Sequence, residues 1–552
     1  VSGSGAATSI FLGVAAGGVA TATDGHANIG FGYQSGMSLT SGHRNVLIGD
    51  NAGKAVSTGD ANVFIGEAAG LKATTAENCI AIGTGALYNT VAGAQSNIAI
   101  GHMAIKTGVA TGDYNTAIGT LALEDLTTGA DNVAIGSSAA LNLTTATDSI
   151  AIGHDAMSGG VTTGNTNIGI GKTTLNSLIA GTGNIALGRS AGKAMVDNEH
   201  NIAIGHHALY TSAGTADKNI AIGYNAMKGA LVTGADNIGI GQLALDALLG
   251  GANNIALGKQ AAEELTTGSD NIALGLTAMG AGITTGDRNI AIGKLSLNTV
   301  TGGEDNIAIG YRALRDTQAT AARNVAIGYQ VAYDGVLTGV DNIIMGTDAA
   351  NAATSLTENI VIGHKAVETG VMTGDHNTVI GPRAAQIITS GADNVIIGGS
   401  AGVSVNTNTK NVLIGSGSDA SAGLDNAYAI GTGASVAQAD SLILGGQTGK
   451  RFRTAIGGIT KPNATLEVSG TINVTGSAVF SGSATNGLGH EGHTLKTIGT
   501  TVMSGTLNNE HFRKMRALEV SGTTSFHGNM FITGNLFVSD IVVAQEFHTE
   551  FV

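Results

Sequence analysis

A five-residue segment with alternating apolar side chains recurs 25 times along this 552-residue chain. Asn97-Ile98-Ala99-Ile100-Gly101 is a representative copy. Consecutive copies begin 17 or 18 residues apart up to residue 411, and then 16 and 14 residues apart. A fixed period of this length is typical of stacked units that each bury an apolar face against the next. The sequence therefore predicts a repetitive rod rather than a set of globular domains.

The alternation within each segment predicts a short strand. Positions two and four are nearly always Ile, Val or Leu, which is period-two patterning in β-branched residues. Ile98 and Ile100 would share one face and stack on the same positions of the next coil. We expect an all-β chain, a long parallel β-solenoid (a β-roll) of about 25 coils. With strands about 4.8 Å apart, the rod would be on the order of 120 Å long.

Glycine closes the segment in all 25 copies, as at Gly101, Gly205 and Gly275. A position that accepts only glycine needs a positive φ or has no space for a Cβ atom. We expect this glycine at the corner where the coil turns. A second apolar pair follows it, as in Ala122-Leu123, and predicts a second strand. A polar turn rich in Thr, Gly and Asp would then close the coil.

Asparagine opens 21 of the 25 segments, as at Asn97, Asn201 and Asn271. Stacked asparagines can hydrogen-bond their amides in a ladder along a fibre. The ladder is the favoured interpretation, and ligand binding by these amides is the alternative.

Position three of the segment is Ala or Gly in every copy from Ala81 to Ala326, including Ala99 and Ala203. Its side chain would point away from the isoleucine pair. A solvated face would tolerate Lys, Thr or Glu there, so something must pack closely against it. We expect the same face of identical chains around a shared axis; that the assembly is a homotrimer is implied by the family resemblances given below. Larger residues such as Phe64 near the ends predict a change in interior width or in partner contacts.

Composition supports a folded chain built on small side chains. It has 86 Gly, 2 Pro, no Trp, 43% hydrophobic and 12% charged residues, which differs from disordered sequences. A net charge of −14 without a basic patch argues against nucleic-acid binding. No apolar run approaches the roughly 20 residues that span a bilayer, so membrane insertion is not expected. Residues 1–20 show no secretory signal pattern. The single Cys79 excludes an intrachain disulfide framework.

Four segments are expected along the chain. They are an N-terminal cap or attachment segment (1–27), the solenoid shaft (28–446), a linker (447–465) and a C-terminal β-structured fibre region (466–552). Glycines recur every six residues within the last segment, at 470, 476 and 482 and again at 522, 528 and 534. Residues 508–516 are the best helix candidate.

The repeat resembles the β-roll of trimeric autotransporter adhesin heads. The closest matches are residues 426–431 and 440–445, which also have the 14-residue spacing of that family. Most coils here carry three or four more residues, so the resemblance implies a similar but wider roll. Its handedness is carried by analogy only.

The C-terminal part resembles phage fibre proteins. Residues 461–470 are similar to a linker common in phage tail fibres, and the six-residue glycine period suits their intertwined trimeric β-structures. Residues 544–552 look like a segment found in structural fibre proteins of marine myoviruses, particularly cyanophages. The resemblance implies an extracellular virion fibre, a tail fibre or similar appendage. Its partners would be identical chains, other virion proteins at one end, and a host-surface receptor, of which a glycan is one option.

The alternative is a bacterial trimeric adhesin or extracellular filament built on the same roll. A carbohydrate-active spike enzyme is a third class. Recurrent Asp-Asn pairs could suggest it, but they sit at turn positions in nearly every coil.

No catalytic or cofactor-binding residues are expected, and the chain is not expected to be an enzyme. The glycines do not form a phosphate loop, because no Lys-Ser/Thr pair or helix follows them. His490 and His493, with Glu491 between them, are weak candidates for a metal site, as is the pair His206-His207. An ordinary polar loop is the favoured interpretation of the segment around His490.

Overall fold

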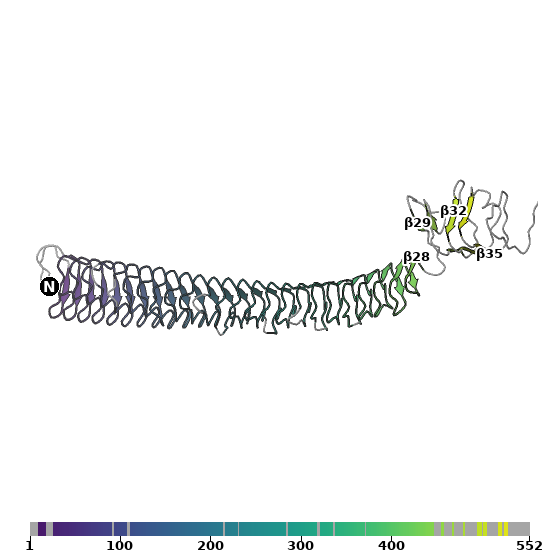
Figure 1. The fold of residues 1–552 in the computed structure, drawn as a ribbon. Coiled ribbons are helices and arrows are strands. Elements are labelled where there is room, and N and C mark those ends of the chain that lie inside the picture. Colours follow the sequence, from purple (N-terminus) through teal and green to yellow (C-terminus); the bar gives the residue numbers. More distant parts are fainter. Residues whose placement is uncertain are drawn as a thin grey trace, which may run out of the picture. The chain divides into compact units, whose positions relative to one another are not determined.

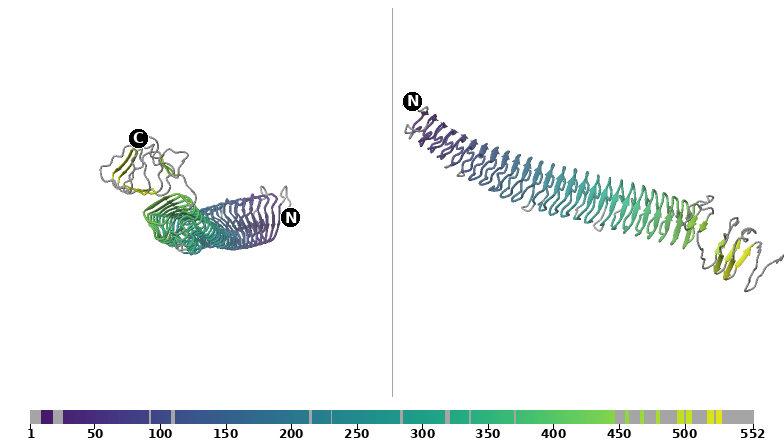
Figure 2. Two further views of the ribbon diagram at one scale, coloured as in Figure 1. Left: turned by 90° about the vertical axis from the view of Figure 1, so that its right-hand side faces the viewer. Right: turned by 90° about the horizontal axis from the view of Figure 1, so that it is seen from above.

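The structure is a computed structural model that divides into two compact units, residues 1–443 and 444–552. The first unit is an elongated, gently curved rod (Figure 1). Its coils stay stacked along the whole length in other views (Figure 2). The described residues are 9–17, 26–90, 93–107, 111–212, 216–229, 231–282, 285–316, 321–334, 337–369 and 371–446, followed by the strands of the second unit.

One 26-stranded sheet runs along the described part of the rod, and each coil contributes one short strand to it. The strands are β1 (Ile10–Leu12), β2 (Ile29–Phe31), β3 (Val46–Ile48), β4 (Val63–Ile65), β5 (Ile80–Ile82), β6 (Ile98–Ile100), β7 (Thr116–Ile118), β8 (Val133–Ile135), β9 (Ile150–Ile152), β10 (Ile168–Ile170), β11 (Ile185–Leu187), β12 (Ile202–Ile204), β13 (Ile220–Ile222), β14 (Ile238–Ile240), β15 (Ile255–Leu257), β16 (Ile272–Leu274), β17 (Ile290–Ile292), β18 (Ile307–Ile309), β19 (Val325–Ile327), β20 (Ile343–Met345), β21 (Ile360–Ile362), β22 (Thr378–Ile380), β23 (Val395–Ile397), β24 (Val412–Ile414), β26 (Ala427–Ile430) and β28 (Ser441–Leu444).

Successive strands pair in parallel with equivalent residues side by side. Ile98 lies opposite Thr116, and Ile100 lies opposite Ile118. This register confirms the predicted parallel β-solenoid. The sheet begins one coil earlier than predicted, because β1 pairs with β2 and places Ile10 opposite Ile29. The segment 1–27 therefore holds a strand of the rod, whose copy of the repeat begins at Ser9 and ends at Gly13.

The closing glycines form the predicted corner, and both reasons for glycine apply. Gly101, Gly205 and Gly275 have φ of +136°, +131° and +136°. A Cβ atom on them would lie 2.4, 2.4 and 2.7 Å from the carbonyl oxygen of the corner glycine in the next coil. Any other residue would need a strained backbone and would also push neighbouring coils apart.

The predicted second strand is wrong for the 17- and 18-residue coils. The pair Ala122-Leu123 lies in a turn in which Leu121 and Leu123 have φ of +59° and +50°. Left-handed residues at alternate positions cannot form an extended strand. The turns still stack, since the Leu123 amide donates to the Ala139 carbonyl of the next coil at 3.0 Å. Among the described residues of the rod, a second strand occurs only where the coils shorten, as β25 (Asp419–Ala420) paired with β27 (Ser435–Val436).

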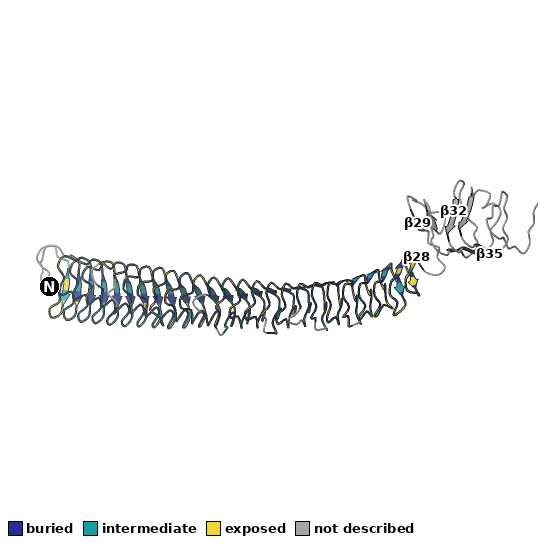
Figure 3. Cartoon of the chain, in the orientation of Figure 1, coloured by how far each residue is buried: buried dark blue, intermediate teal, exposed yellow. Residues whose placement is uncertain are grey.

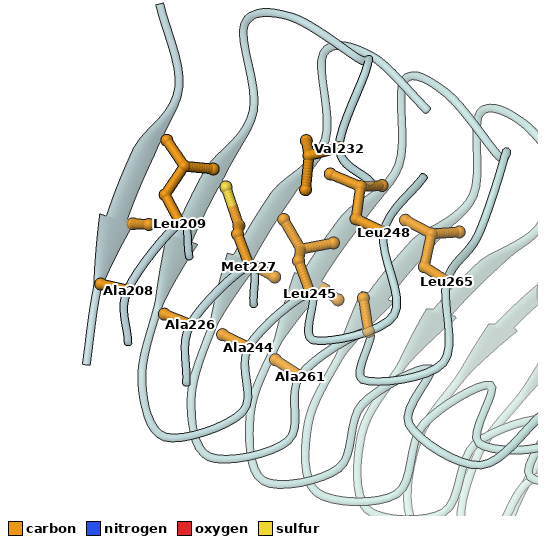
Figure 4. Packing of buried hydrophobic residues seen from close by; sticks show 14 of the residues in the cluster. Ala208, Leu209, Ala226, Met227, Val232, Ala244, Leu245, Leu248, Ala261 and Leu265 are labelled. Carbon is orange, nitrogen blue, oxygen red and sulfur yellow. The ribbon is translucent and has the colours of Figure 1, made fainter. Parts of the chain in front are cut away.

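The Ala/Gly face of the sheet lies inside the coil, so its assignment to a contact between chains is wrong. Ala99 and Ala203 are 0% exposed within a single chain. Buried residues follow the sheet along the rod (Figure 3). Apolar residues from the turns fill the same interior in columns, one formed by Ala208, Ala226 and Ala244 and another by Leu209 and Leu245 (Figure 4). Ile98 and Ile100 point the opposite way and stay partly exposed.

The second unit contains seven short described strands that also pair in parallel. Strand β31 pairs with β33 and β33 with β35, while β32 pairs with β34 and β29 with β30. The strands are β29 (Thr454–Ile456), β30 (Leu466–Val468), β31 (Ala478–Phe480), β32 (Thr494–Ile498), β33 (Thr501–Ser504), β34 (Ala517–Ser521) and β35 (Thr524–His527). Except for the β29–β30 pair, partners are 23 residues apart, as for Ala478 and Thr501. The periodic glycines and the helix candidate at 508–516 lie outside the described residues.

Candidate assembly face

The outer face of the long sheet carries two columns of apolar side chains, the first and third residues of each strand. From β2 to β24 these positions hold Ile, Val, Leu, Met or Phe, except for Thr116 and Thr378. We call these two columns the apolar stripe. None of its residues is charged. Ile170 is 39% exposed and Ile343 is 40% exposed, whereas the central residue of every one of these strands is buried.

An apolar stripe of this length is unusual on a protein that acts alone. The largest contiguous apolar patch on a typical monomer covers a few hundred Å². Here the stripe continues over 23 successive strands. Because the strands pair in register, equivalent side chains of neighbouring strands lie side by side in each column. Such a surface is typical of a protein–protein contact.

The asparagine ladder lies inside the rod, next to the sheet. The Asn115 backbone amide and Nδ2 donate to Asn97 Oδ1 at 2.8 and 3.1 Å. Asn115 Nδ2 also donates to the Gly129 carbonyl at 2.9 Å, which ties the turn to the strand. The pattern repeats along the rod, for example between Asn201 and Asn184 and between Asn271 and Asn254.

These hydrogen bonds confirm the predicted ladder and exclude the ligand-binding alternative for its members. Asn97 and Asn201 are 0% exposed and Asn271 is 1% exposed. Cys79 takes the place of asparagine in one coil, where its amide still donates to Asn62 Oδ1 at 3.0 Å. Burial raises the pKa of the Cys79 thiol to about 11. The thiol is therefore a packing group rather than a reactive one.

Exposed polar residues border the apolar stripe on both sides. We call the residue before each ladder position the upstream flank and the residue after each corner glycine the downstream flank. Upstream, Arg288 pairs with Asp305 at 2.7 Å and Arg323 pairs with Asp341 at 2.6 Å. The Arg288 guanidinium holds the pKa of the Asp305 carboxyl below its usual range. Each pair joins neighbouring coils, so the flank residues of successive coils lie side by side there.

The downstream flank forms a second column through its aromatic and basic residues. The rings of His206 and Tyr224 stack at 5.5 Å, and those of Tyr311 and Tyr329 stack at 5.2 Å. Arg189 Nε donates to His206 Nε2 at 2.9 Å. The two flanks and the stripe between them therefore make one surface that keeps the same width in every coil.

The structure gives no support to the predicted metal candidates. His206 stacks on His207 with ring centroids 3.7 Å apart. Partial burial and the neighbouring His206 and Arg189 lower the pKa of His207. No group of three His, Cys, Asp or Glu side chains in the described ranges could hold a metal ion. His490 and His493 lie outside those ranges.

The turn aspartates that stand two residues before a ladder position have structural partners rather than a shared site. Asp113 Oδ1 accepts the Gln95 amide at 2.7 Å, and Asp217 Oδ1 accepts the Glu199 amide at 2.8 Å. Each carboxylate thus fastens one coil to the coil before it.

Within the same described ranges, the chain forms no helix long and apolar enough to cross a membrane.

No protein-family model matches the chain, and no curated protein matches its sequence.

Proposed function

We propose that this chain is the shaft of an extracellular structural fibre, a virion tail fibre or similar appendage, and that it is not an enzyme. The long apolar stripe carries the proposal, because it offers a rod of stacked coils a lengthwise contact. The closed interior agrees with a mechanical role, since ladder amides and turn carboxylates are used to fasten coil to coil.

The fibre is a homotrimer in this proposal, with the apolar stripes of three chains facing a shared axis. The apolar stripe replaces the Ala/Gly face as the proposed contact between chains, because the Ala/Gly face is already covered by the chain's own turns. Three stripes around one axis would cover both exposed columns and leave the polar turns in water. Burying the columns gains roughly 25 cal/mol for each Å² of apolar surface, which accumulates over many coils.

The partners follow from the resemblance of the C-terminal residues to phage fibres. One end of the fibre would join other virion proteins, and the fibre would contact a host-surface receptor or carry a tip that does so. The second candidate, a bacterial trimeric adhesin or extracellular filament, is favoured by the 14-residue coil from Asn426 to Ala439. Neighbouring genes for virion proteins would separate the first candidate from the second.

Mass in solution, measured by light scattering or native mass spectrometry, tests the assembly. A value of about 164 kDa, three times the 54.6 kDa chain, is expected. Electron microscopy should show a rod section on the order of 120 Å long, from strand spacing of about 4.8 Å. A mass of one chain at micromolar concentration would contradict the trimer. If antibodies raised against the rod fail to label virions of the virus whose genome encodes this chain, the virion assignment is wrong.

A further inference from the structure

Over β7–β23 the two flanks of the apolar stripe carry opposite charge, whereas nearer the N-terminus Asp50 and Glu67 lie on the downstream flank and Arg44 on the upstream one. Over β7–β23 the upstream flank has eight carboxylates and three cations, and the residues of these flanks are exposed for most of the rod. The carboxylates are Asp131, Asp148, Asp236, Asp270, Asp305, Asp341, Glu358 and Asp393. The downstream flank has four cations and no carboxylate over the same strands. Those cations are Lys172, Arg189, Lys259 and Lys294.

Partners within the chain do not cancel this asymmetry. Two of the three upstream cations, Arg288 and Arg323, are paired with carboxylates of their own flank. None of the four downstream cations forms an ion pair among the described residues. The four downstream cations are therefore available to pair with carboxylates outside the chain.

Orientation decides which flanks meet when two such rods bring their stripes together. Rods that run parallel, related by rotation about an axis along the rod, place the downstream flank of one against the upstream flank of the next. Rods that run antiparallel place like flanks together, so that cations face cations and carboxylates face carboxylates. Opposite potentials across an interface favour the correct partner, and like charges oppose the wrong one.

We propose that copies of this chain associate in parallel through the apolar stripe, with the cationic downstream flank of each chain seated on the acidic upstream flank of its neighbour. This rests on the proposed assembly and adds its direction. A contact between two different flanks is heterologous, and rotation closes it into a ring. All N-termini then lie at one end of the fibre and all C-termini at the other. A shaft that joins virion proteins at one end and carries a receptor contact at the other requires this arrangement.

With the chains level around the ring, the charges match well when each downstream cation reaches the upstream residue of the neighbour that lies one coil nearer the N-terminus. This pairing sets Lys172, Lys259 and Lys294 against Asp148, Asp236 and Asp270 of the neighbour. A basic side chain can span one coil, because Arg288 reaches Asp305 one coil away within the chain.

Cysteine cross-linking distinguishes the two orientations in the full-length protein. Cys79→Ser gives a cysteine-free background, and Ser149 already occupies the equivalent ladder position. Lys172→Cys combined with Asp148→Cys, and separately with Thr166→Cys, tests the parallel contact with a short bifunctional thiol reagent. The expected product of at least one of these variants is a covalent trimer. A link within one chain would leave the product at the mass of one chain, so it cannot be mistaken for the covalent trimer.

Lys172→Cys with Lys294→Cys tests the antiparallel contact. These residues follow β10 and β17, each the tenth strand from an end of the 26-stranded sheet. This variant should stay uncross-linked, and covalent dimers from it would overturn the proposal. A mass of three chains without cross-links in either parallel variant would overturn it too, while leaving the proposed trimer standing. A monomer would overturn both.

Charge exchange provides a second measurement. Changing the four downstream cations to Glu should lower the trimer fraction at low salt. Adding Asp148→Lys, Asp236→Lys and Asp270→Lys to the same chain should restore much of it, since the three matched contacts of Lys172, Lys259 and Lys294 are then inverted. Both exchanges suit their turns, because Glu67 lies on the downstream flank and Lys218 on the upstream one. Failure of the second set to restore trimers would contradict the pairing of unlike flanks.

Discussion

Gly70 makes room for the ring of Phe64 inside the rod. Gly70 has φ of +61°, and a Cβ atom built on it would lie 2.4 Å from Phe64 Cδ2. The two residues are six apart, one on the inner face of β4 and one in the following turn. In the next coil the sizes are exchanged, with Ala81 on the strand and Leu87 in the turn, both fully buried. Each coil thus fills a similar interior volume in one of two ways.

This volume exchange predicts the effect of Gly70→Ala. The new methyl group would clash with Phe64 and occupy a left-handed backbone, so we expect destabilisation of about 1–3 kcal/mol. Phe64→Ala with Gly70→Leu reproduces the Ala81–Leu87 layer and should recover part of that loss. Thermal or denaturant unfolding measures both. Gly250→Ala, at an exposed turn with no atom nearer than 3.7 Å to the added Cβ, serves as the control and should be close to neutral.

Repetition made most of the fold predictable from sequence. A residue that recurs in every coil stacks on itself, so corner glycines such as Gly101, ladder asparagines such as Asn97 and the strand register all followed from spacing alone. The structure after the corner glycine could not be predicted in this way. A turn with left-handed residues at alternate positions, such as Leu123, has the same apolar pattern in sequence as a short strand.

For the candidate site, the wrong prediction was the one that placed the Ala/Gly face of the sheet at the contact between chains. Ile98 and Ile100 are larger and more apolar than Ala99, so hydrophobicity alone places them inside. In this coil the interior has no space for them, since Ile105 from the turn already fills it beside Ala99. The pairing of a large strand residue with glycine six residues later, as in Phe64 and Gly70, is the sequence signal that identifies the inner face.

Charge on the two faces of one strand should have different consequences. Ala203→Glu places a carboxylate in the closed interior, and we expect it to cost several kcal/mol and to prevent folding of nearby coils. Ile202→Lys with Ile220→Lys places two cations on the apolar stripe, which costs an isolated rod little but opposes trimer formation. Circular dichroism and solution mass separate these effects. A stripe variant that remains fully trimeric would show that the stripe is not the contact.

Removing one ladder amide should weaken the rod locally. Asn237 Nδ2 donates to Asn219 Oδ1 and to the Gly251 carbonyl, and Asn237 Oδ1 accepts two hydrogen bonds from Asn254. Asn237→Ala leaves buried donors of Asn254 without an acceptor, so we expect a loss of roughly 3 kcal/mol or more. Asn253→Ala is the matched control, because Asn253 is exposed and Ala61 occupies its turn position elsewhere. Equal unfolding midpoints for the two variants would contradict the structural role of the ladder.

The buried thiol of Cys79 predicts a pH dependence at the alkaline end. Its pKa is raised from 9.0 to about 11, so the folded chain holds the proton that the unfolded chain releases. Stability is therefore unaffected by this group below pH 9 and declines as the pH rises from about 9 to 11. Cys79→Ser should remove that part of the decline. Unfolding midpoints of both proteins at pH 8 and pH 10.5 measure it, and parallel slopes would contradict the assignment. A thiol reagent at pH 8 should also react slowly with the folded chain and at once with the unfolded chain, since only the exposed thiol forms thiolate readily.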